Sequence, residues 1–333
     1  MNLQVDIFYY AFAFSVVLFS SFLARKIKSS FDEKTDEYDL IRKYLLNDDS
    51  LQGNKKPKIW IHSIYDVNSR IWKSFQSRNS TNLNQHYLHL TIKSIINFCG
   101  DDFNVCLIDD DSFSKLIPSW EIDIKTAAEP MRSKLREIAL LELIYLYGGM
   151  VVPNSFLCLK SLKELYDQLP FICERVSRHI KQGDYVPDTY FIGAKKNDEI
   201  IAKIILLLKE KVTRPFLTEE DNLLGITNSY CNILVQSQKI NLVKGEYIGI
   251  KTNKSKIVSV DELTGDDFID FNDKMYGIYL PIDDFLNRNK YNWFPIMSID
   301  ELLKSSMIIS KYFKMSIMSS VKNEPKITMN KSI

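Results

Sequence analysis

Three consecutive aspartates, Asp109, Asp110 and Asp111, directly follow the apolar run of residues 103–108. Carboxylates at the end of a strand can bind the hydroxyls of a ribose or share a divalent metal ion. Followed by Ser112, they are also typical of a strand end that leads into a helix, where an N-cap and the helix dipole favour acidic side chains. Both interpretations stay open for Asp109, whereas the helix cap is favoured for Asp111.

A second polar group begins the predicted helix over residues 130–147, where Arg132, Lys134 and Arg136 are spaced two apart. Such basic side chains could neutralise an anionic ligand, for example a diphosphate, without a metal ion. In the alternative interpretation, the three cations bind no ligand: Arg136 faces acidic residues inside the fold, and Arg132 and Lys134 are solvated. This second interpretation is favoured.

Several other residue types could take part in chemistry. Asp184 and Asp188 in the loop QGDYVPD could line an acceptor site, although aspartates beside Gly and Pro usually form turns. We expect His62, on the first predicted strand, to be a hydrogen-bonded core residue rather than a base. Residues 288–294 (RNKYNWF) mix cations with aromatic rings, which could stack on a base or sugar or could cover the sheet.

Cysteine and histidine do not form a recognisable metal-binding pattern. The five cysteines are widely spaced in apolar runs, and none of the four histidines completes a metal-ligand spacing with them. We therefore expect reduced cysteines in the core, at positions Cys99, Cys106, Cys158, Cys173 and Cys231.

The elements that must position these side chains alternate between strands and helices. Residues 58–63 and 103–108 are compact apolar runs that predict buried strands, and residues 84–98 between them have a helical apolar period. A strand, a helix and a strand that ends in carboxylates are typical of an α/β nucleotide-binding domain.

The helix over 130–147 is apolar almost all round from Ile138 onward, so we expect it to be buried. Gly148-Gly149 ends it, and a short strand over 150–152 must stop at Pro153, which cannot donate to a sheet. The alternation continues with strands over 171–176 and 189–194 and helices over 198–211 and 219–237.

Composition and the N-terminus indicate the setting. The 333 residues carry a formal net charge of +1, which gives no overall field to hold a nucleic acid. Residues 7–24 are 18 uncharged, mostly apolar residues, the minimum for a membrane-spanning helix. A signal peptide would need a basic segment before them, where only Asp6 is charged. The basic residues at 25, 26 and 28 predict that the rest of the chain is cytoplasmic.

These elements resemble the glycosyltransferases with a DxD sugar-binding motif and the related capsular polysaccharide synthesis proteins. The resemblance rests on the run from Lys58 to Trp60, on IDDD at 108–111, and on SKLREIALLELIYLYGGMVVPNS from Ser133 to Ser155. That last stretch is similar to the family signature, an Asp-x-x-Arg helix that runs into Tyr-Gly-Gly, a short strand and Asp-x-Asp. Residues 57–240 are covered, and the resemblance implies a GT-A-like fold with a Rossmann-like mixed sheet.

The sequence departs from this family at its carboxylates. In the family, two aspartates after the strand hold a divalent metal against the diphosphate of a sugar nucleotide, and the aspartate that opens the helix helps to bind the donor. The corresponding positions here are Pro153, Ser155 and Ser133, with Asn154 between the first two. Neutral side chains cannot replace carboxylate ligands for Mg²⁺ or Mn²⁺, so we expect no metal cofactor. The candidates for donor binding are Asp109, Asp110, Ser133 and Arg136, and no catalytic residue is assigned.

Together these observations predict a membrane anchor over residues 1–28, a stalk over 29–56, a GT-A-like domain over 57–300 and a C-terminal helix and tail over 301–333. The expected function is that of a glycosyltransferase-like binding or scaffold protein with a degenerate donor site. The alternatives are an active, metal-independent glycosyltransferase and a structural membrane or virion protein. Expected partners are the membrane, through residues 7–24, and a nucleotide sugar or glycan acceptor, but no nucleic acid.

Overall fold

The computed structural model describes residues 56–63, 85–118, 120–175, 185–212 and 220–322, all within one compact unit that spans residues 48–333. The predicted membrane segment and residues 29–55 of the predicted stalk lie outside these ranges. The strands are β1 (Lys58–His62), β2 (Asn104–Ile108), β3 (Gly149–Val151), β4 (Phe156–Cys158), β5 (Phe171–Arg175), β6 (Val186–Ala194), β7 (Asn241–Val243) and β8 (Gly277–Tyr279). The α-helices are α3 (Tyr87–Cys99), α4 (Asp110–Leu116), α5 (Met131–Tyr147), α6 (Lys163–Tyr166), α7 (Glu199–Val212), α8 (Glu220–Gln236), α9 (Val260–Thr264), α10 (Ile282–Asn287), α11 (Ile299–Lys304) and α12 (Ile308–Lys322).

Six strands form the main sheet in the order β2-β1-β3-β6-β5-β7. Strand β1 pairs in parallel with β2 and β3, β6 runs antiparallel to both β3 and β5, and β7 is parallel to β5. The fold is therefore mixed α/β with a mostly parallel sheet, which confirms the predicted fold class at this level. The strands expected at 58–63, 103–108, 150–152, 171–176 and 189–194 are all present.

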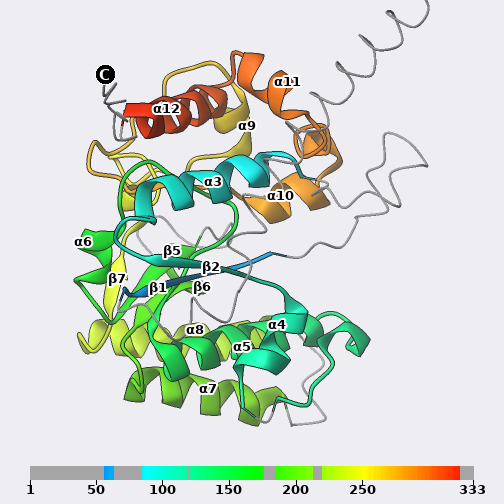
Figure 1. Ribbon diagram of the computed structural model, residues 1–333, viewed down its shortest axis with the longest axis vertical. Helices are drawn as coiled ribbons and strands as arrows, with labels where there is room; N and C mark the ends of the chain where they lie inside the picture. Colours follow the sequence, from blue (N-terminus) through cyan, green and yellow to red (C-terminus); the bar gives the residue numbers. More distant parts are fainter. Residues whose placement is uncertain (1–55, 64–84, 119, 176–184, 213–219, 323–333) are drawn as a thin grey trace, which may run out of the picture. The chain divides into compact units, whose positions relative to one another are not determined.

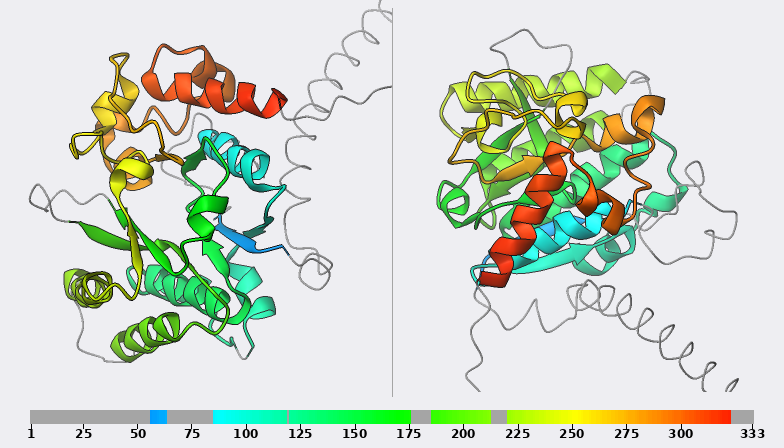
Figure 2. Two further views of the ribbon diagram at one scale, coloured as in Figure 1. Left: turned by 90° about the vertical axis from the view of Figure 1, so that its left-hand side faces the viewer. Right: turned by 90° about the horizontal axis from the view of Figure 1, so that it is seen from above.

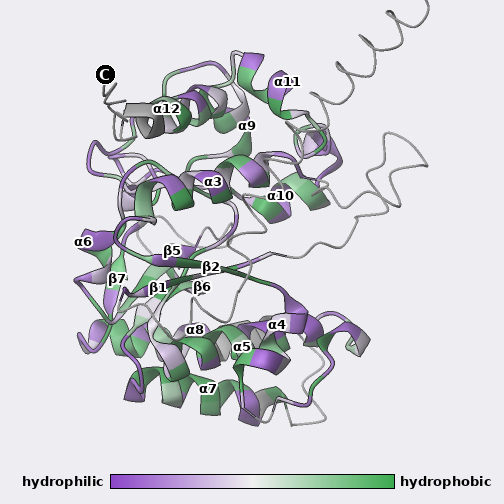
Figure 3. Ribbon diagram, viewed as in Figure 1, coloured by the Kyte–Doolittle hydropathy of each residue, from purple (hydrophilic) through white to green (hydrophobic). Residues whose placement is uncertain are grey.

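Strand β1 shows why these segments become central strands. Ile59, Trp60 and Ile61 have no exposed surface, so both faces of the strand are covered, as expected of a central parallel strand. Hydrophobic residues are also prominent on α7 and α8 (Figure 3). The Trp60 indole Nε1–H donates to the carbonyl of Gly148 at 3.1 Å, which satisfies the only polar atom of that side chain.

Helix α5 and the glycines after it confirm the predicted buried helix. Leu141 and Ile144 have no exposed surface, and the apolar side chains around the helix are covered on several sides. Gly149 has a φ of 104°, and a Cβ at this position would lie 2.2 Å from the carbonyl oxygen of Lys58. Only glycine therefore lets β3 approach β1 closely enough to pair.

Two helical layers cover the main sheet (Figures 1 and 2). Helices α4, α5, α7 and α8 lie on one face, while α3 lies on the other and is covered in turn by α11 and α12. The outer side of α3 shares an apolar cluster with the C-terminal part of the chain, including Tyr87, Phe285, Phe294 and Phe313. Residues 299–322 thus pack into this layer.

The small antiparallel pair of β4 and β8 joins the C-terminal half of the chain to the strand end after β3. None of the predicted elements corresponds to this pair, because its two strands are three residues long and lie more than a hundred residues apart. Across the described ranges, no helix combines the length and the apolar character needed to span a membrane.

Candidate functional site at the carboxyl edge of the sheet

Five strands of the main sheet end at a common edge. Strands β2, β1 and β3 are mutually parallel, β5 runs the same way because β6 is antiparallel to both β3 and β5, and β7 is parallel to β5. The residues at or just after these strand ends are His62, Asp109, Val152, Arg175 and Val243, and Val186 begins β6 at the same edge. In open α/β sheets this edge is where ligands bind.

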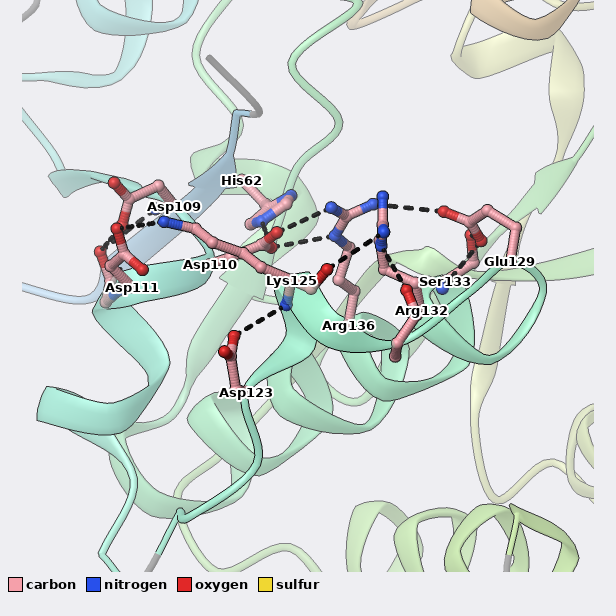
Figure 4. Close-up of polar contacts among 12 residues, drawn as sticks. His62, Asp109, Asp110, Asp111, Asp123, Lys125, Glu129, Arg132, Ser133 and Arg136 are labelled. Atoms are coloured by element: carbon pink, nitrogen blue, oxygen red, sulfur yellow. Dashed lines mark hydrogen bonds and ion pairs between the residues drawn. The ribbon is translucent and has the colours of Figure 1, made fainter. Parts of the chain in front are cut away.

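Asp110 is the centre of a buried ionic cluster at this edge (Figure 4). Its Oδ1 accepts from Arg136 Nε at 2.9 Å, and its Oδ2 accepts from Arg136 Nη2 at 2.7 Å. His62 Nε2 lies 2.9 Å from Oδ1 and donates to it, because an ionised carboxylate can only accept. The expectation that Arg136 faces acidic residues inside the fold is confirmed, and so is the expectation that His62 is hydrogen-bonded.

Burial alone would raise the pKa of the Asp110 carboxyl. The hydrogen bonds and positive charges of His62 and Arg136 lower it by more than burial raises it, so the pKa lies well below the usual range. The side chains of His62, Asp110 and Arg136 are only 12%, 9% and 10% exposed. A ligand that used any one of them would have to break an established pair. Asp110 and Arg136, two of the predicted donor-binding residues, thus satisfy each other.

The other two aspartates take structural roles at the start of α4. Asp109 is the N-cap, with its carboxylate accepting from the Ser112 amide at 2.9 Å and from the Ser112 hydroxyl at 2.6 Å. Asp111 lies in the first turn and pairs with Lys125 at 2.8 Å on the surface. The N-cap is therefore Asp109, and the expectation that Asp111 is the cap was wrong, because the helix already begins at Asp110. Asp111 instead places favourable charge in the first turn and pairs with Lys125.

The remaining cations of α5 differ from the expectation that they are solvated. Lys134 is buried, and its ammonium group donates to Glu137 Oε2 at 3.1 Å. Arg132 is partly buried and donates to the backbone carbonyls of Ala127 and Lys125 at 2.9 and 3.2 Å. The prediction that Lys134 is solvated was wrong, because its ammonium group pairs with Glu137 three residues along the same helix inside the fold. Arg132 keeps part of its surface exposed while its guanidinium donates to carbonyls that precede the helix.

Ser133, where the family signature has aspartate, lies beside another carboxylate. Its hydroxyl donates to Glu129 Oε2 at 2.6 Å and its amide donates to the same oxygen at 3.2 Å (Figure 4). Glu129 Oε1 lies 3.7 Å from Arg136 Nη1, and the side chain is 53% exposed. A carboxylate is therefore present at the opening of α5, four residues earlier in the chain than the resemblance implies.

The segment after β3 carries no carboxylate. The carbonyl of Pro153 accepts from the Phe156 amide at 3.0 Å, and the carbonyl of Asn154 accepts from the Thr91 hydroxyl at 2.5 Å. Ser155 is 2% exposed, and its carbonyl accepts from the Leu280 amide at 3.2 Å. Within the described ranges, no group of three or more His, Cys, Asp or Glu side chains is arranged to hold a metal ion.

A bulge in β6 brings further polar residues to the edge, and the sequence analysis missed their role. The pairing with β5 shifts between Ile172, opposite Ile192, and Cys173, opposite Asp188, so residues 189–191 have no partner on β5. In this bulge the Thr189 hydroxyl donates to Glu137 at 2.5 Å. The Tyr190 hydroxyl donates to the carbonyl of Ser133 at 2.8 Å. Bulges commonly redirect side chains beside active sites.

Asp188 is a buried strand residue, so the prediction that it forms a turn was wrong. Its carboxylate accepts from the Tyr190 amide and from the Tyr279 hydroxyl, both at 3.0 Å. Burial raises the pKa of Asp188, and the nearby Arg175 lowers it in part. The two adjacent charged residues Glu174 and Arg175, near the end of the otherwise apolar strand predicted over 171–176, were the signal that could have drawn attention to Arg175. Asp184 lies outside the described residues.

The remaining candidates belong to the core. Tyr291 and Phe294, from the cation-aromatic segment 288–294, are buried in the apolar cluster beside α3, so this segment packs there. All five cysteines are free thiols in the interior, as predicted.

Comparisons with known proteins give little further information. No protein-family model and no curated protein matches the chain. Among solved structures, one match is described as "PaToxG Glycosyltransferase", with 13% sequence identity and a TM-score of 0.35, covering 86% of this chain and 97% of that chain. This degree of structural overlap is too low to assign a fold or a function.

Proposed function

We propose that this chain is a glycosyltransferase-like protein that binds a nucleotide sugar at the carboxyl edge of its sheet and holds the diphosphate without a divalent metal ion. The observation that carries the proposal is the chemical character of this edge. The segment from Pro153 to Ser155 offers no carboxylate, whereas Arg175 at the end of β5 places an accessible guanidinium group on the same edge.

The reasoning starts from the charge of the ligand. A diphosphate needs its negative charge neutralised, and a protein can do this with a metal ion held by carboxylates or with basic side chains. The loop after β3 lacks the carboxylate ligands that Mg²⁺ and Mn²⁺ prefer, and Ser155 in this loop is buried away from solvent. Among the described residues of this edge, basic side chains can supply the neutralisation.

We propose donor binding without transfer as the main activity, because the best-placed acids are engaged elsewhere. Asp110 is held by two partners, and Asp188 is buried and hydrogen-bonded. One observation favours the second candidate, an active metal-independent transferase. Glu129 is an exposed carboxylate beside Ser133, and such a group could accept the proton of an acceptor hydroxyl.

Binding of UDP-sugars and GDP-sugars by isothermal titration, in EDTA and then in Mn²⁺, tests the proposal. We expect binding in EDTA and no gain in affinity with Mn²⁺. Absence of binding in both conditions, or binding only with Mn²⁺, would overturn it. Release of free sugar or transfer to an acceptor, measured in EDTA, would favour the second candidate, and its loss in Glu129→Gln would assign the base.

We also propose that residues 7–24, which lie outside the described residues, anchor the chain in a membrane with the domain on the cytoplasmic side. The apolar length of this segment and the basic residues at 25, 26 and 28 support the proposal.

A further inference from the structure

Arg175 is the last residue of β5 and lies at the carboxyl edge of the sheet. Its Nη2 contacts Asp283 Oδ2, on α10, at 3.5 Å, and the two side chains are 40% and 74% exposed. An exposed ion pair at this distance is weak and is easily exchanged for another anion. The guanidinium group is therefore accessible and loosely held.

Three other cations of this edge, Arg136, Lys134 and Lys251, are committed to buried partners. Arg136 makes two short hydrogen bonds to Asp110. Lys134 pairs with Glu137, and Lys251 pairs with Glu174, with all four of these side chains at most 12% exposed. Breaking any of these pairs would leave a buried charge without a partner, which costs several kcal/mol. Among these four cations, Arg175 can accept a new anion at the lowest cost.

A neighbouring carboxylate stabilises the positive charge of Arg175. Asp188 lies opposite Cys173, two residues before Arg175 on β5, so the two charged side chains are neighbours on the same stretch of sheet. The Tyr279 hydroxyl holds the Asp188 carboxylate at 3.0 Å. Burial alone would lower the pKa of the Arg175 guanidinium. The negative charge of Asp188, together with the other acidic groups nearby, raises it by more than burial lowers it, so the pKa lies above its ordinary value. A buried carboxylate thus supports a cation whose outer side faces solvent.

We propose that the Arg175 guanidinium binds the diphosphate of the nucleotide-sugar donor and that Asp283 occupies this guanidinium in the absence of donor. The planar guanidinium can give two parallel hydrogen bonds to phosphate oxygens, which a lysine cannot. This inference rests on the proposed function and adds the residue that takes the place of the metal ion.

The test measures binding of UDP and GDP to the full-length chain in EDTA, with uridine, guanosine and inorganic pyrophosphate as further probes. We expect Arg175→Met to weaken binding of the nucleoside diphosphates and pyrophosphate at least about ten-fold and to leave nucleoside affinity unchanged. Arg288→Met is the matched control, because Arg288 is 41% exposed and contacts Asp284 at 3.7 Å. The control should bind all probes like the unaltered protein.

A second variant gives an effect of the opposite sign. Asp283→Asn removes the resident anion, so we expect UDP affinity to rise about two- to five-fold, whereas a purely structural pair would give a loss. Unchanged UDP binding in Arg175→Met, or an equal loss in Arg288→Met, would overturn the assignment of Arg175 and leave the proposed function standing. If the unaltered protein binds neither UDP nor GDP, the proposed function itself fails and this inference fails with it.

Discussion

Replacing Asp110 by Asn changes one atom and should destabilise the protein by about 3 kcal/mol at neutral pH. The unaltered carboxylate accepts two hydrogen bonds from Arg136 and one from His62. An asparagine has one acceptor oxygen, so its NH₂ group would face a donor of Arg136 or His62. Arg136 would also keep its charge in a site where it is only 10% exposed.

The magnitude follows from the burial of the pair. Removing one partner of a buried ion pair costs about 3–5 kcal/mol. The lower end applies here, because Glu129 lies 3.7 Å from Arg136 Nη1 and can take over part of the neutralisation. A loss of this size is a large fraction of a typical domain stability of about 5–15 kcal/mol.

Urea unfolding followed by tryptophan fluorescence measures this loss, since Trp60 is fully buried. Asp111→Asn is the matched control, one residue along the same helix, because Asp111 and its partner Lys125 are 63% and 58% exposed. Such a surface pair contributes at most about 1 kcal/mol. Equal effects of the two variants would refute the assignment of Asp110 as the centre of the buried cluster.

The pH dependence adds a second check. The pKa of Asp110 is lower in the folded protein than in the unfolded chain, so its contribution is fully present above the unfolded pKa of about 3.9. It is lost as the pH falls toward the folded pKa. The stability gap between the unaltered protein and Asp110→Asn should therefore shrink below about pH 4, by up to about 1.4 kcal/mol per pH unit. A gap that stayed constant or widened as the pH fell below about 4 would contradict the reasoning.

Two further predictions concern the strand end after β3 and the N-terminus. The double variant Pro153→Asp with Ser155→Asp should gain no Mn²⁺ affinity in titration calorimetry. Because Ser155 is buried, this variant should also be less stable to urea than Pro153→Asp alone. Tight Mn²⁺ binding by a stable double variant would contradict this prediction. In sealed vesicles with the cytoplasmic face outward, external protease should digest the chain beyond residue 28. Asn79, which begins the glycosylation acceptor triplet Asn-Ser-Thr, should carry no glycan, whereas a protected, glycosylated domain would reverse the orientation.

The main sheet was predictable because its signals are local. Strand β1 is a short apolar run after Pro57, and α5 lies between Pro130 and Gly148 with apolar residues around it. Proline and glycine positions and the period of the hydrophobic residues can be recognised within a single helix or strand. They therefore predict whether each segment is a helix or a strand, and the order of these elements along the chain. The α/β fold follows from that order.

The site could not be predicted in the same way, because its contacts join distant parts of the chain. The Tyr279 hydroxyl reaches Asp188 across 91 residues, and Arg175 reaches Asp283 across 108. Sequence neighbours of Asp188 suggested a turn, whereas the bulge in β6 and the packing of β8 bury it in the sheet. Lys134 is a different case, because its partner Glu137 lies only three residues along the same helix, and what the sequence pattern does not reveal is the burial of this pair inside the fold.

The location of Arg175 bears on why binding without transfer is the main proposal. The resemblance to the DxD glycosyltransferases places the diphosphate at the end of β3, whereas the accessible guanidinium lies at the end of β5, with β6 between them. Neighbouring strands are about 4.8 Å apart, so a diphosphate held by Arg175 would be displaced by about 10 Å along the edge. Transfer requires the reacting atoms to be within about 3.5 Å of each other, which a displacement of this size does not preserve. A donor bound at Arg175 therefore needs an acceptor site that is displaced by the same amount. Glu129, the candidate base, is not displaced toward Arg175, because it contacts Arg136 and Ser133 at the start of α5.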